Sequence, residues 1–310
     1  MEHRGIVLGL YASDPGFDYA VSLDEIRAMH ASTVLLLVTI DQATIETPRP
    51  GPFSAAGERV LRRVLRQARE RELRVAVLPI VAVKELAVGK WRGTISPPDW
   101  HAWFDAYRTE LTRIARIADE GRADLLAVGS ELCSSEEHED EWLQTISAVR
   151  KSFSGKLTYS SNWDHLPLEP WVETLDFLGL NAYFELVCED QATSLPGIVQ
   201  AWRQVQTYEV EPWQRRFGKP IVFLEVGYPS TTGADRYPWD YEKKPAIDEG
   251  IQQDLYAAFL RSWEDRTYVD GVFFYVWWEG ADRDPWGYTP RGKPAGELLR
   301  AWFQHLGEAR

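Results

Sequence analysis

The chain has 310 residues, a formal net charge of −13 at pH 7 and an aromatic share of 13%. The excess of acid argues against nucleic acid or an anionic membrane as a partner, because both attract clustered Lys and Arg. The length suits one α/β barrel, so we expect a single domain over residues 1–310. Two cysteines, Cys133 and Cys188, supply neither a disulfide framework nor a thiolate metal cage.

The first residues contain nothing that resembles a secretory signal, and no apolar run reaches the ~18 residues that a membrane helix needs. We therefore expect a cytoplasmic protein with no membrane partner, unless a leader has been removed from the chain. No Gly-rich phosphate loop follows a strand-like run, so no cofactor is expected.

Eight apolar runs of strand length alternate with amphipathic stretches along the chain. The strand-like runs are 5–11, 32–41, 74–83, 123–132, 156–163, 176–184, 219–228 and 269–279. The helical stretches are 23–31, 55–72, 99–120, 138–153, 194–217, 246–266 and 294–307, whereas 164–175 is weakly helical at best. Nearly continuous apolar runs are typical of parallel strands covered on both sides. Eight such units predict a closed (β/α)8 TIM barrel.

Two of these runs carry a glutamate at or near their C-terminal end. Glu131 closes the run LLAVGSE, and Glu225 lies near the end of IVFLEVGY. These are the fourth and seventh runs, and barrel strands open onto one face, so the two side chains can converge there. Glycoside hydrolysis needs such a pair, one carboxyl to protonate the leaving oxygen and one carboxylate to attack. Taken singly, each Glu is explained equally well by solvent exposure or an Arg partner.

Several stretches in a fixed order resemble clan A glycoside hydrolases, and most of all glycoside hydrolase family 113, the β-mannanase-like group. They cover about residues 70 to 305 and include GKWRGTISPPDWHAWFDAYRTEL, LLAVGSEL, LDFLGLNAYFEL, GKPIVFLEVGYPST, GVFFYVWWEG and RGKPAGELLRAWF. The resemblance implies Glu131 as general acid/base and Glu225 as nucleophile of a retaining double displacement. It further implies a carboxyl separation of roughly 5 to 5.5 Å and a β-linked mannan or manno-oligosaccharide as substrate.

The resemblance also suggests residues that contact the nucleophile or the sugar. Tyr183 has the position of a tyrosine that hydrogen-bonds the nucleophile, although a core-capping role explains it too. Trp277 and Trp278 end the eighth run, where such barrels place an aromatic platform under the sugar. Because side chains alternate along a strand, only one of the two points inward, and we favour Trp278.

A second group of candidates comes from loops and strand ends. Trp91 and Arg92 in the KWRG loop are suited to holding a sugar ring and its hydroxyls, or equally to anchoring the loop. Asn162 and Asn181 are candidate sugar-binding amides, since an amide both donates and accepts hydrogen bonds. Turn and strand-end chemistry accounts for both asparagines just as well.

The chain departs from the resemblance at two positions. Ser130 stands before the acid/base, where many clan A enzymes carry Asn, and Leu224 precedes the nucleophile, where Thr is common. The preference for manno- or gluco-type sugar therefore stays open. Two alternatives remain: another retaining β-glycosidase or transglycosylase acting on a gluco-type substrate, and a catalytically silent barrel that binds saccharide.

The acidic run from Ser134 to Trp142 includes His138 and has the appearance of a cation site. Acidic residues are also favoured at a helix N-terminus, and a helix is expected to begin here. We assign the run to that helix start and expect no metal.

Overall fold

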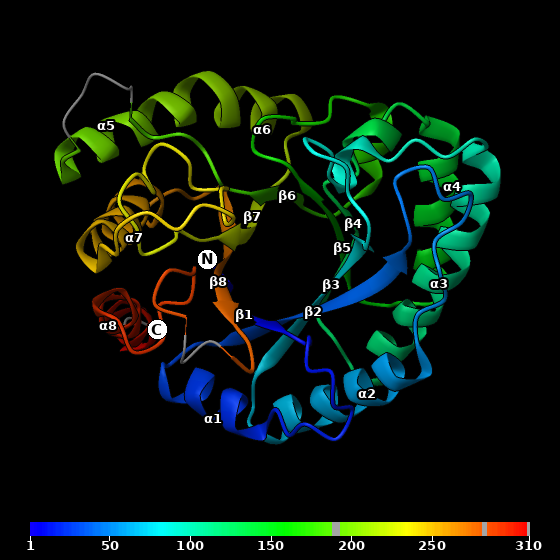
Figure 1. Ribbon diagram of the computed structural model, residues 1–310, viewed down its shortest axis with the longest axis horizontal. Coiled ribbons are helices and arrows are strands. Elements are labelled where there is room, and N and C mark those ends of the chain that lie inside the picture. The colour runs from blue at the N-terminus through cyan, green and yellow to red at the C-terminus, as the bar shows by residue number, and fades with distance from the viewer. Residues whose placement is uncertain (188–192, 281–283, 309–310) are drawn as a thin grey trace.

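The computed structural model describes residues 1–187, 193–280 and 284–308, so Cys188 lies outside the described residues. Eight parallel strands pair in sequence order, and the eighth returns to the first to close a barrel. Helices surround the strands on the outside (Figure 1). The prediction of a (β/α)8 barrel is confirmed.

Each predicted strand run overlaps one strand of the barrel. The strands are β1 (His3–Gly9), β2 (Thr33–Gln42), β3 (Arg74–Val83), β4 (Leu125–Ser130), β5 (Lys156–Ser161), β6 (Leu178–Asn181), β7 (Ile221–Val226) and β8 (Val269–Trp277). The helices are α1 (Ala20–Ala28), α2 (Ala55–Glu70), α3 (Trp100–Glu120), α4 (Glu139–Arg150), α5 (Leu195–Val205), α6 (Glu211–Phe217), α7 (Glu249–Trp263) and α8 (Pro294–Glu308). Short 3-10 turns are η1 (Arg92–Thr94), η2 (Cys133–Ser135) and η3 (Pro170–Thr174).

The predicted helix over 194–217 is the clearest difference from the sequence analysis. It consists of α5, one π-helical turn, η4 (Gln206–Val210), and α6. The π turn keeps the chain helical between α5 and α6, so the apolar pattern of the sequence continues through it. The pattern therefore does not reveal that the helix changes its hydrogen bonding there. Other helices begin where side-chain caps predict. Ser54 accepts from the Gly57 amide at 2.9 Å, and Asp99 accepts from the Ala102 amide at 3.1 Å.

Strand alternation divides the apolar side chains between two layers. The larger layer lies between strands and helices, with Leu36, Val77 and Phe223 against the helical faces. The inner layer fills the barrel and comprises Val7, Leu35, Leu37, Ala76, Leu78, Leu125, Ala127, Phe177, Val222, Leu224, Phe273 and Val276. This packing fills the barrel interior with side chains.

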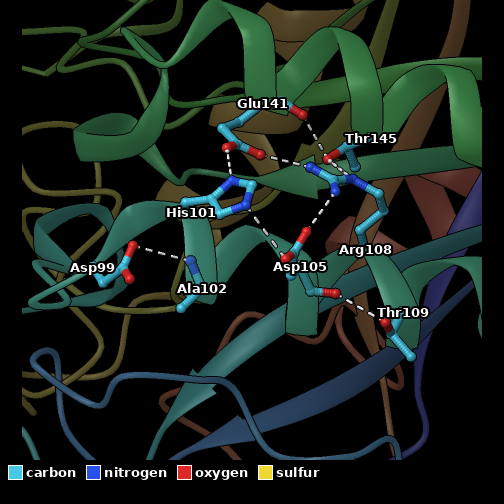
Figure 2. A network of polar contacts seen from close by, with 8 residues as sticks. All are labelled: Asp99, His101, Ala102, Asp105, Arg108, Thr109, Glu141 and Thr145. Atoms are coloured by element: carbon cyan, nitrogen blue, oxygen red, sulfur yellow. Dashed lines mark hydrogen bonds and ion pairs between the residues drawn. The ribbon is translucent and has the colours of Figure 1, made fainter.

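A partly exposed ion-pair network joins α3 and α4, the helices that flank β4 in the chain (Figure 2). Arg108 of α3 pairs with Glu141 of α4 at 2.6 Å, and the Glu141 carboxylate also contacts His101 at 2.6 Å. Asp105 completes the network through Arg108 at 2.8 Å. Its exposed members contribute little to stability alone, but the network connects the two helices through side chains. Across the described ranges, every helix is too short or too polar to span a lipid bilayer.

Candidate active site

Glu131 lies immediately after β4 and leaves the strand in an unusual conformation. The pairing of β4 with β5 shifts between Ala127 and Ser130, and Glu131 has a φ of 52°. A left-handed backbone at a residue other than glycine is strained by about 1 kcal/mol or more. The Glu131 amide donates to the Ser160 carbonyl of β5 at 2.8 Å, which holds the turn. The barrel therefore fixes this side chain at the mouth although the local backbone resists it.

Both oxygens of the Glu131 carboxylate receive hydrogen bonds. Arg92 of η1 donates from Nη2 to Oε2 at 2.6 Å, and Asn181 at the end of β6 donates from Nδ2 to Oε1 at 2.8 Å. Ser160 of β5 donates to the Oδ1 of Asn181 at 2.6 Å, so the amide orientation is fixed. The side chain of Glu131 is 7% exposed. Its position is thus set by three different elements of the barrel.

Glu225 belongs to β7 and reaches the mouth through a break in strand register. Ile221 and Phe223 face the helices, so strict alternation would send Glu225 outward as well. The pairing of β7 with β8 shifts between Phe223 and Val226, and Val226 instead joins the outer layer. Glu225 is 4% exposed and accepts a hydrogen bond from the Tyr183 hydroxyl at 2.7 Å.

Asn181 connects the two carboxyls. It pairs with Glu225 across the β6–β7 ladder and hydrogen-bonds Glu131 with its side chain. Burial, and then the negative charge of Glu131, raise the pKa of Glu225 to about 7, while Arg92 and the Tyr183 hydrogen bond lower it. Burial alone would lower the pKa of Arg92, but both carboxylates raise it above its usual range. The site therefore holds two interacting carboxyls and one permanent cation.

Tyrosines surround Glu225. The Tyr183 ring lies 6.4 Å from the Tyr275 ring and 6.0 Å from the Tyr288 ring, centroid to centroid. Tyr11, which follows β1, is hydrogen-bonded to Tyr275. Burial is the main reason that the pKa of each of these phenols is raised, so all four are neutral near pH 7. The sequence pointed to Tyr183 alone among these four tyrosines. Tyr275 lies in the stretch GVFFYVWWEG, beside the two tryptophans that were predicted to contact sugar.

A third buried glutamate, Glu136, lies behind Glu131. Glu136 is 1% exposed and accepts from the Tyr159 hydroxyl at 2.6 Å. The same hydroxyl accepts from the Leu132 amide, next to Glu131, at 2.8 Å. His165 lies 3.1 Å from the other Glu136 oxygen. Sequence analysis had grouped Glu136 with the acids of a helix start, which is correct for the first turn of α4 and wrong for Glu136 itself.

The two tryptophans at the end of β8 point in opposite directions. Trp277 is 2% exposed, belongs to the outer layer and donates to Glu25 of α1 at 3.1 Å. Trp278 is half-buried and packs against the inner layer with Tyr11 and Tyr275. The inclusion of Trp277 among the sugar-binding candidates is therefore wrong, because its ring and N–H are used between strand and helix. Trp278 remains a candidate.

The remaining predicted residues have settings of different kinds. Arg92 and Asn181 contact Glu131, so neither guanidinium nor amide is free for sugar alone. The Trp91 ring covers Gly93, where an added Cβ would lie 2.4 Å from it. Asn162 is 7% exposed and donates to Asp164 at 2.6 Å rather than to either catalytic candidate. Trp91 and Asn162 therefore stay predictions.

One group of potential metal ligands is found in the described part of the chain. Glu2, His3 and Asp270 place ligand atoms within 4.8 Å of one another at the N-terminal ends of β1 and β8. Arg74 already pairs with Glu2 there. This group lies at the opposite end of the strands from Glu131 and Glu225, and we assign it no role in the site.

Comparisons with known proteins agree with this geometry. Among solved structures, a family 113 β-1,4-mannanase superposes with a TM-score of 0.85 at 22% identity, covering 98% of this chain and 99% of that one. The β-mannanase of Alicyclobacillus acidocaldarius in complex with ManMIm gives 0.85 at 23% identity, with 98% of both chains covered. A Faecalibacterium prausnitzii β-glucuronidase gives 0.67 at 14% identity, covering 99% of this chain and 49% of that one.

These likenesses at low identity establish the fold. A comparison with curated proteins gives no match. The family assignment comes from the sequence model of Glycoside Hydrolase Family 113, which matches residues 18–285. That range includes Glu131, Glu225, Arg92, Asn181 and Tyr183, and it spans the barrel from α1 to β8. The chain belongs to glycoside hydrolase family 113.

Proposed function

We propose that the chain hydrolyses β-1,4-linked mannan or manno-oligosaccharides with retention of anomeric configuration. The observation that carries the proposal is a pair of buried, interacting carboxyls, Glu131 and Glu225, with unlike partners at one face of the barrel. Carboxyls in unlike settings divide the roles of acid and nucleophile. The mannan substrate is supported by the β-mannanase structures of family 113 that the fold resembles.

In this mechanism Glu225 attacks the anomeric carbon while Glu131 protonates the departing oxygen. The product of this step is a glycosyl ester on Glu225, and Glu131 is left as a carboxylate. Glu131 then removes a proton from water, whose oxygen attacks the anomeric carbon and releases Glu225. Tyr183 donates to Glu225 and stabilises its ionised form for the attack. Trp278 supplies an aromatic face for the sugar ring.

The experiment is an activity screen against manno-, gluco- and xylo-oligosaccharides of equal length, with anomeric proton NMR of the first product. We expect turnover on the manno series, with the product formed first as the β-anomer. The Glu225→Gln variant should fold and bind but not turn over. Preference for the gluco series would replace the substrate assignment, and tight saccharide binding without turnover would show a silent barrel.

A further inference from the structure

The connection from β5 to β6 differs from the other connections of the barrel. Residues 162–177 are all described, and between these two strands they form only the five-residue turn η3. Every other pair of strands that follow each other in the chain is connected through at least one α-helix. A groove of about 620 Å³ lies beside this connection, between residues 163–168 and residues 208–216 of η4 and α6. The groove has the volume of a ligand site, and none of the residues that hydrogen-bond Glu131 or Glu225 line it.

The two walls of the groove are joined by side chains of α6. The Trp213 indole N–H donates to the Pro167 carbonyl at 2.9 Å, and Nη2 of Arg216 donates to the Leu168 carbonyl at 2.9 Å. Both contacts hold the backbone of an irregular segment against a helix. The groove is therefore formed before any ligand arrives, and binding there requires little ordering of the chain.

Each wall presents an aromatic ring. Tyr208 belongs to the π turn η4 and is 76% exposed. Trp163 lies on the opposite wall, is half-buried, and packs edge-on against Phe184 with the ring centroids 5.8 Å apart. Turns of the π type occur frequently at functional sites. The flat apolar face of an aromatic ring suits the C–H face of a sugar ring, so both walls can contact a saccharide.

Polar groups on both walls are available to a ligand. In the part of the chain that the structure describes, the Tyr208 hydroxyl, the Glu209 carboxylate and the Trp163 indole N–H form no hydrogen bond. These groups include donors and acceptors, and a sugar hydroxyl needs both because it donates and accepts. An apolar lining with a few polar groups is the usual composition of a small-molecule site.

The groove begins close to the catalytic mouth of the barrel. Asn162 directly follows β5 and donates to Asp164, which lines the groove, at 2.6 Å. Burial, and then the charges of Glu136, Glu131 and Asp164, raise the pKa of the Cys133 thiol. Asp164 and Glu131 are therefore both within electrostatic reach of one side chain. A ligand in the groove would lie beside the mouth and outside it.

The charges of the lining favour a neutral ligand that is rich in hydroxyls. The charged lining groups are the carboxylates of Asp164 and Glu209 and the guanidinium of Arg216, in a chain of net charge −13. Such surroundings do not attract an anion. A protein helix docked here would take these charged side chains out of water, which is costly, whereas sugar hydroxyls would hydrogen-bond them.

We propose that this groove is a second saccharide site, which binds a β-1,4-linked chain beside the catalytic mouth without cleaving it. The linkage of the chain rests on the proposed function, whereas the site rests on the groove itself. A chain held there raises the local concentration of glycosidic bonds at the mouth. Only a long chain can occupy the groove and the mouth together, so a short oligosaccharide gains nothing from the second site.

Binding is tested by NMR in the Glu225→Gln variant, so that the saccharide is not consumed. The indole ¹⁵N–H signals of Trp163 and Trp278 report on the groove and on the mouth, and Trp163→Phe and Trp278→Phe assign them. Mannohexaose and cellohexaose are titrated separately to millimolar concentration. We expect the Trp163 signal to move with a Kd that differs from the Kd given by Trp278.

Substitutions at Tyr208 test which contact binds the chain. Tyr208→Ala should weaken the Kd at Trp163 by about 2- to 10-fold, the range of one aromatic contact, and leave the Kd at Trp278 unchanged. Tyr208→Phe keeps the ring and should bind as the unmodified groove does. Val21→Ala is the matched control, because it removes apolar atoms at a position of α1 that is 62% exposed.

Kinetics test whether the groove serves long chains. In Tyr208→Ala the KM for polymeric β-mannan should rise by about 2- to 10-fold with kcat unchanged. Both constants for mannotetraose should equal those of the unmodified protein. An equal rise of KM on the two substrates would show that Tyr208 acts at the mouth, and would overturn the inference.

The outcomes separate this inference from the proposed function. A Trp163 signal that moves with neither hexasaccharide would overturn the inference and leave the proposed function intact. A Trp163 signal that moves with protein concentration alone would also overturn it, since a second copy of the chain would then occupy the groove. Movement with cellohexaose alone would support the second site and contradict the mannan assignment. If no mannoside is turned over, the proposed function fails, and the Trp163 titration still decides the inference.

Discussion

Glu131 and Glu225 are buried to the same extent, 5% and 4% exposed, yet their surroundings have opposite character. Glu131 is cross-linked by a guanidinium and an amide from two other elements. Glu225 is enclosed by neutral phenols, of which Tyr183 contacts it directly. Burial alone therefore does not assign the roles of the pair. The hydrogen-bond donors distinguish the two carboxyls instead, because Glu131 accepts from a charged guanidinium and an amide, whereas Glu225 accepts from a neutral hydroxyl.

The largest expected effect comes from replacing either catalytic carboxyl. The two replacements are distinguished by two substrates that differ in their need for acid catalysis. Glu225→Gln should lower turnover on every mannoside by roughly 10⁴-fold or more, because the nucleophile is lost. Glu131→Gln should lower kcat/KM on oligosaccharides by about 10² to 10⁴-fold but largely spare 2,4-dinitrophenyl β-mannoside. Steady-state rates on both substrates make the comparison.

Added azide sharpens this comparison, since a small anion can replace the water that Glu131 activates. In Glu131→Gln it should raise turnover of the dinitrophenyl substrate and give a β-mannosyl azide, whereas in Glu225→Gln it should not give that product. Equal losses on both substrates for the two variants would contradict the assignment of separate roles.

Removing the Tyr159 hydroxyl, which supports the segment behind Glu131, should have the next largest effect. In Tyr159→Phe the buried Glu136 carboxylate and the Leu132 amide each lose a hydrogen bond. Leaving two buried polar groups short of a partner should lower the free energy of unfolding by about 2 to 4 kcal/mol, measured by urea denaturation. Tyr107→Phe is the matched control, because its buried hydroxyl donates to one neutral carbonyl, that of Val128, at 2.9 Å. A similar loss of unfolding free energy in both variants would mean that the hydrogen bond to the Glu136 carboxylate stabilises the fold no more than one to a neutral carbonyl.

The barrel and both carboxyls were predictable because their signals are local. An apolar run reports a buried strand, and a carboxylate at its end reports a strand that opens on a site. Glu131 follows β4 directly, and Glu225 lies near the end of its run. At the end of β8, alternation predicted that only one of Trp277 and Trp278 points inward and favoured Trp278, although it could not show the irregular pairing before them. Strand pairing between β1 and β8 shifts between Ile6 and Leu8, and a shift in register is invisible to a pattern of period two.

Long-range contacts explain why the sequence did not reveal the contacts of Asn181 and Glu136. Asn181 was expected to bind sugar, but its side chain is engaged by Ser160 and Glu131, which are 21 and 50 residues away. Glu136 looked like one of several acids at a helix start, and only its contact with Tyr159, 23 residues on, explains its burial. A residue type shows what a side chain is able to do. Its partner decides what it does, and that partner is set by the closed barrel.

Removing one phenol from the surroundings of Glu225 should give a smaller effect with a defined pH signature. The Tyr183 hydrogen bond lowers the pKa of Glu225, so Tyr183→Phe should raise that pKa further. Fewer molecules then carry an ionised nucleophile at a given pH, and the acidic limb of kcat/KM should move to higher pH. Loss of a hydrogen bond to a carboxylate, at about 1.5 to 3 kcal/mol, corresponds to roughly a 10- to 100-fold fall in kcat/KM. An unmoved acidic limb would show that Tyr183 only packs against the site.

The smallest expected effect lies at the outer end of the Glu136 network. The hydrogen bond that His165 donates to Glu136 is the main cause that raises the pKa of His165 above 6.5, with the charges of Glu169 and Asp164 adding to it. The protonated imidazole therefore stabilises the folded state fully below pH 6.5, and this contribution is lost as pH rises through the raised pKa. His165 is 51% exposed, so solvent screening limits the gain to under about 1 kcal/mol. His165→Gln should lower Tm by at most roughly 2 °C at about pH 6 and leave it unchanged near about pH 9. A difference that grows toward the higher pH would mean that burial of the Glu136 carboxylate, and not its pairing with His165, dominates the stability of this network.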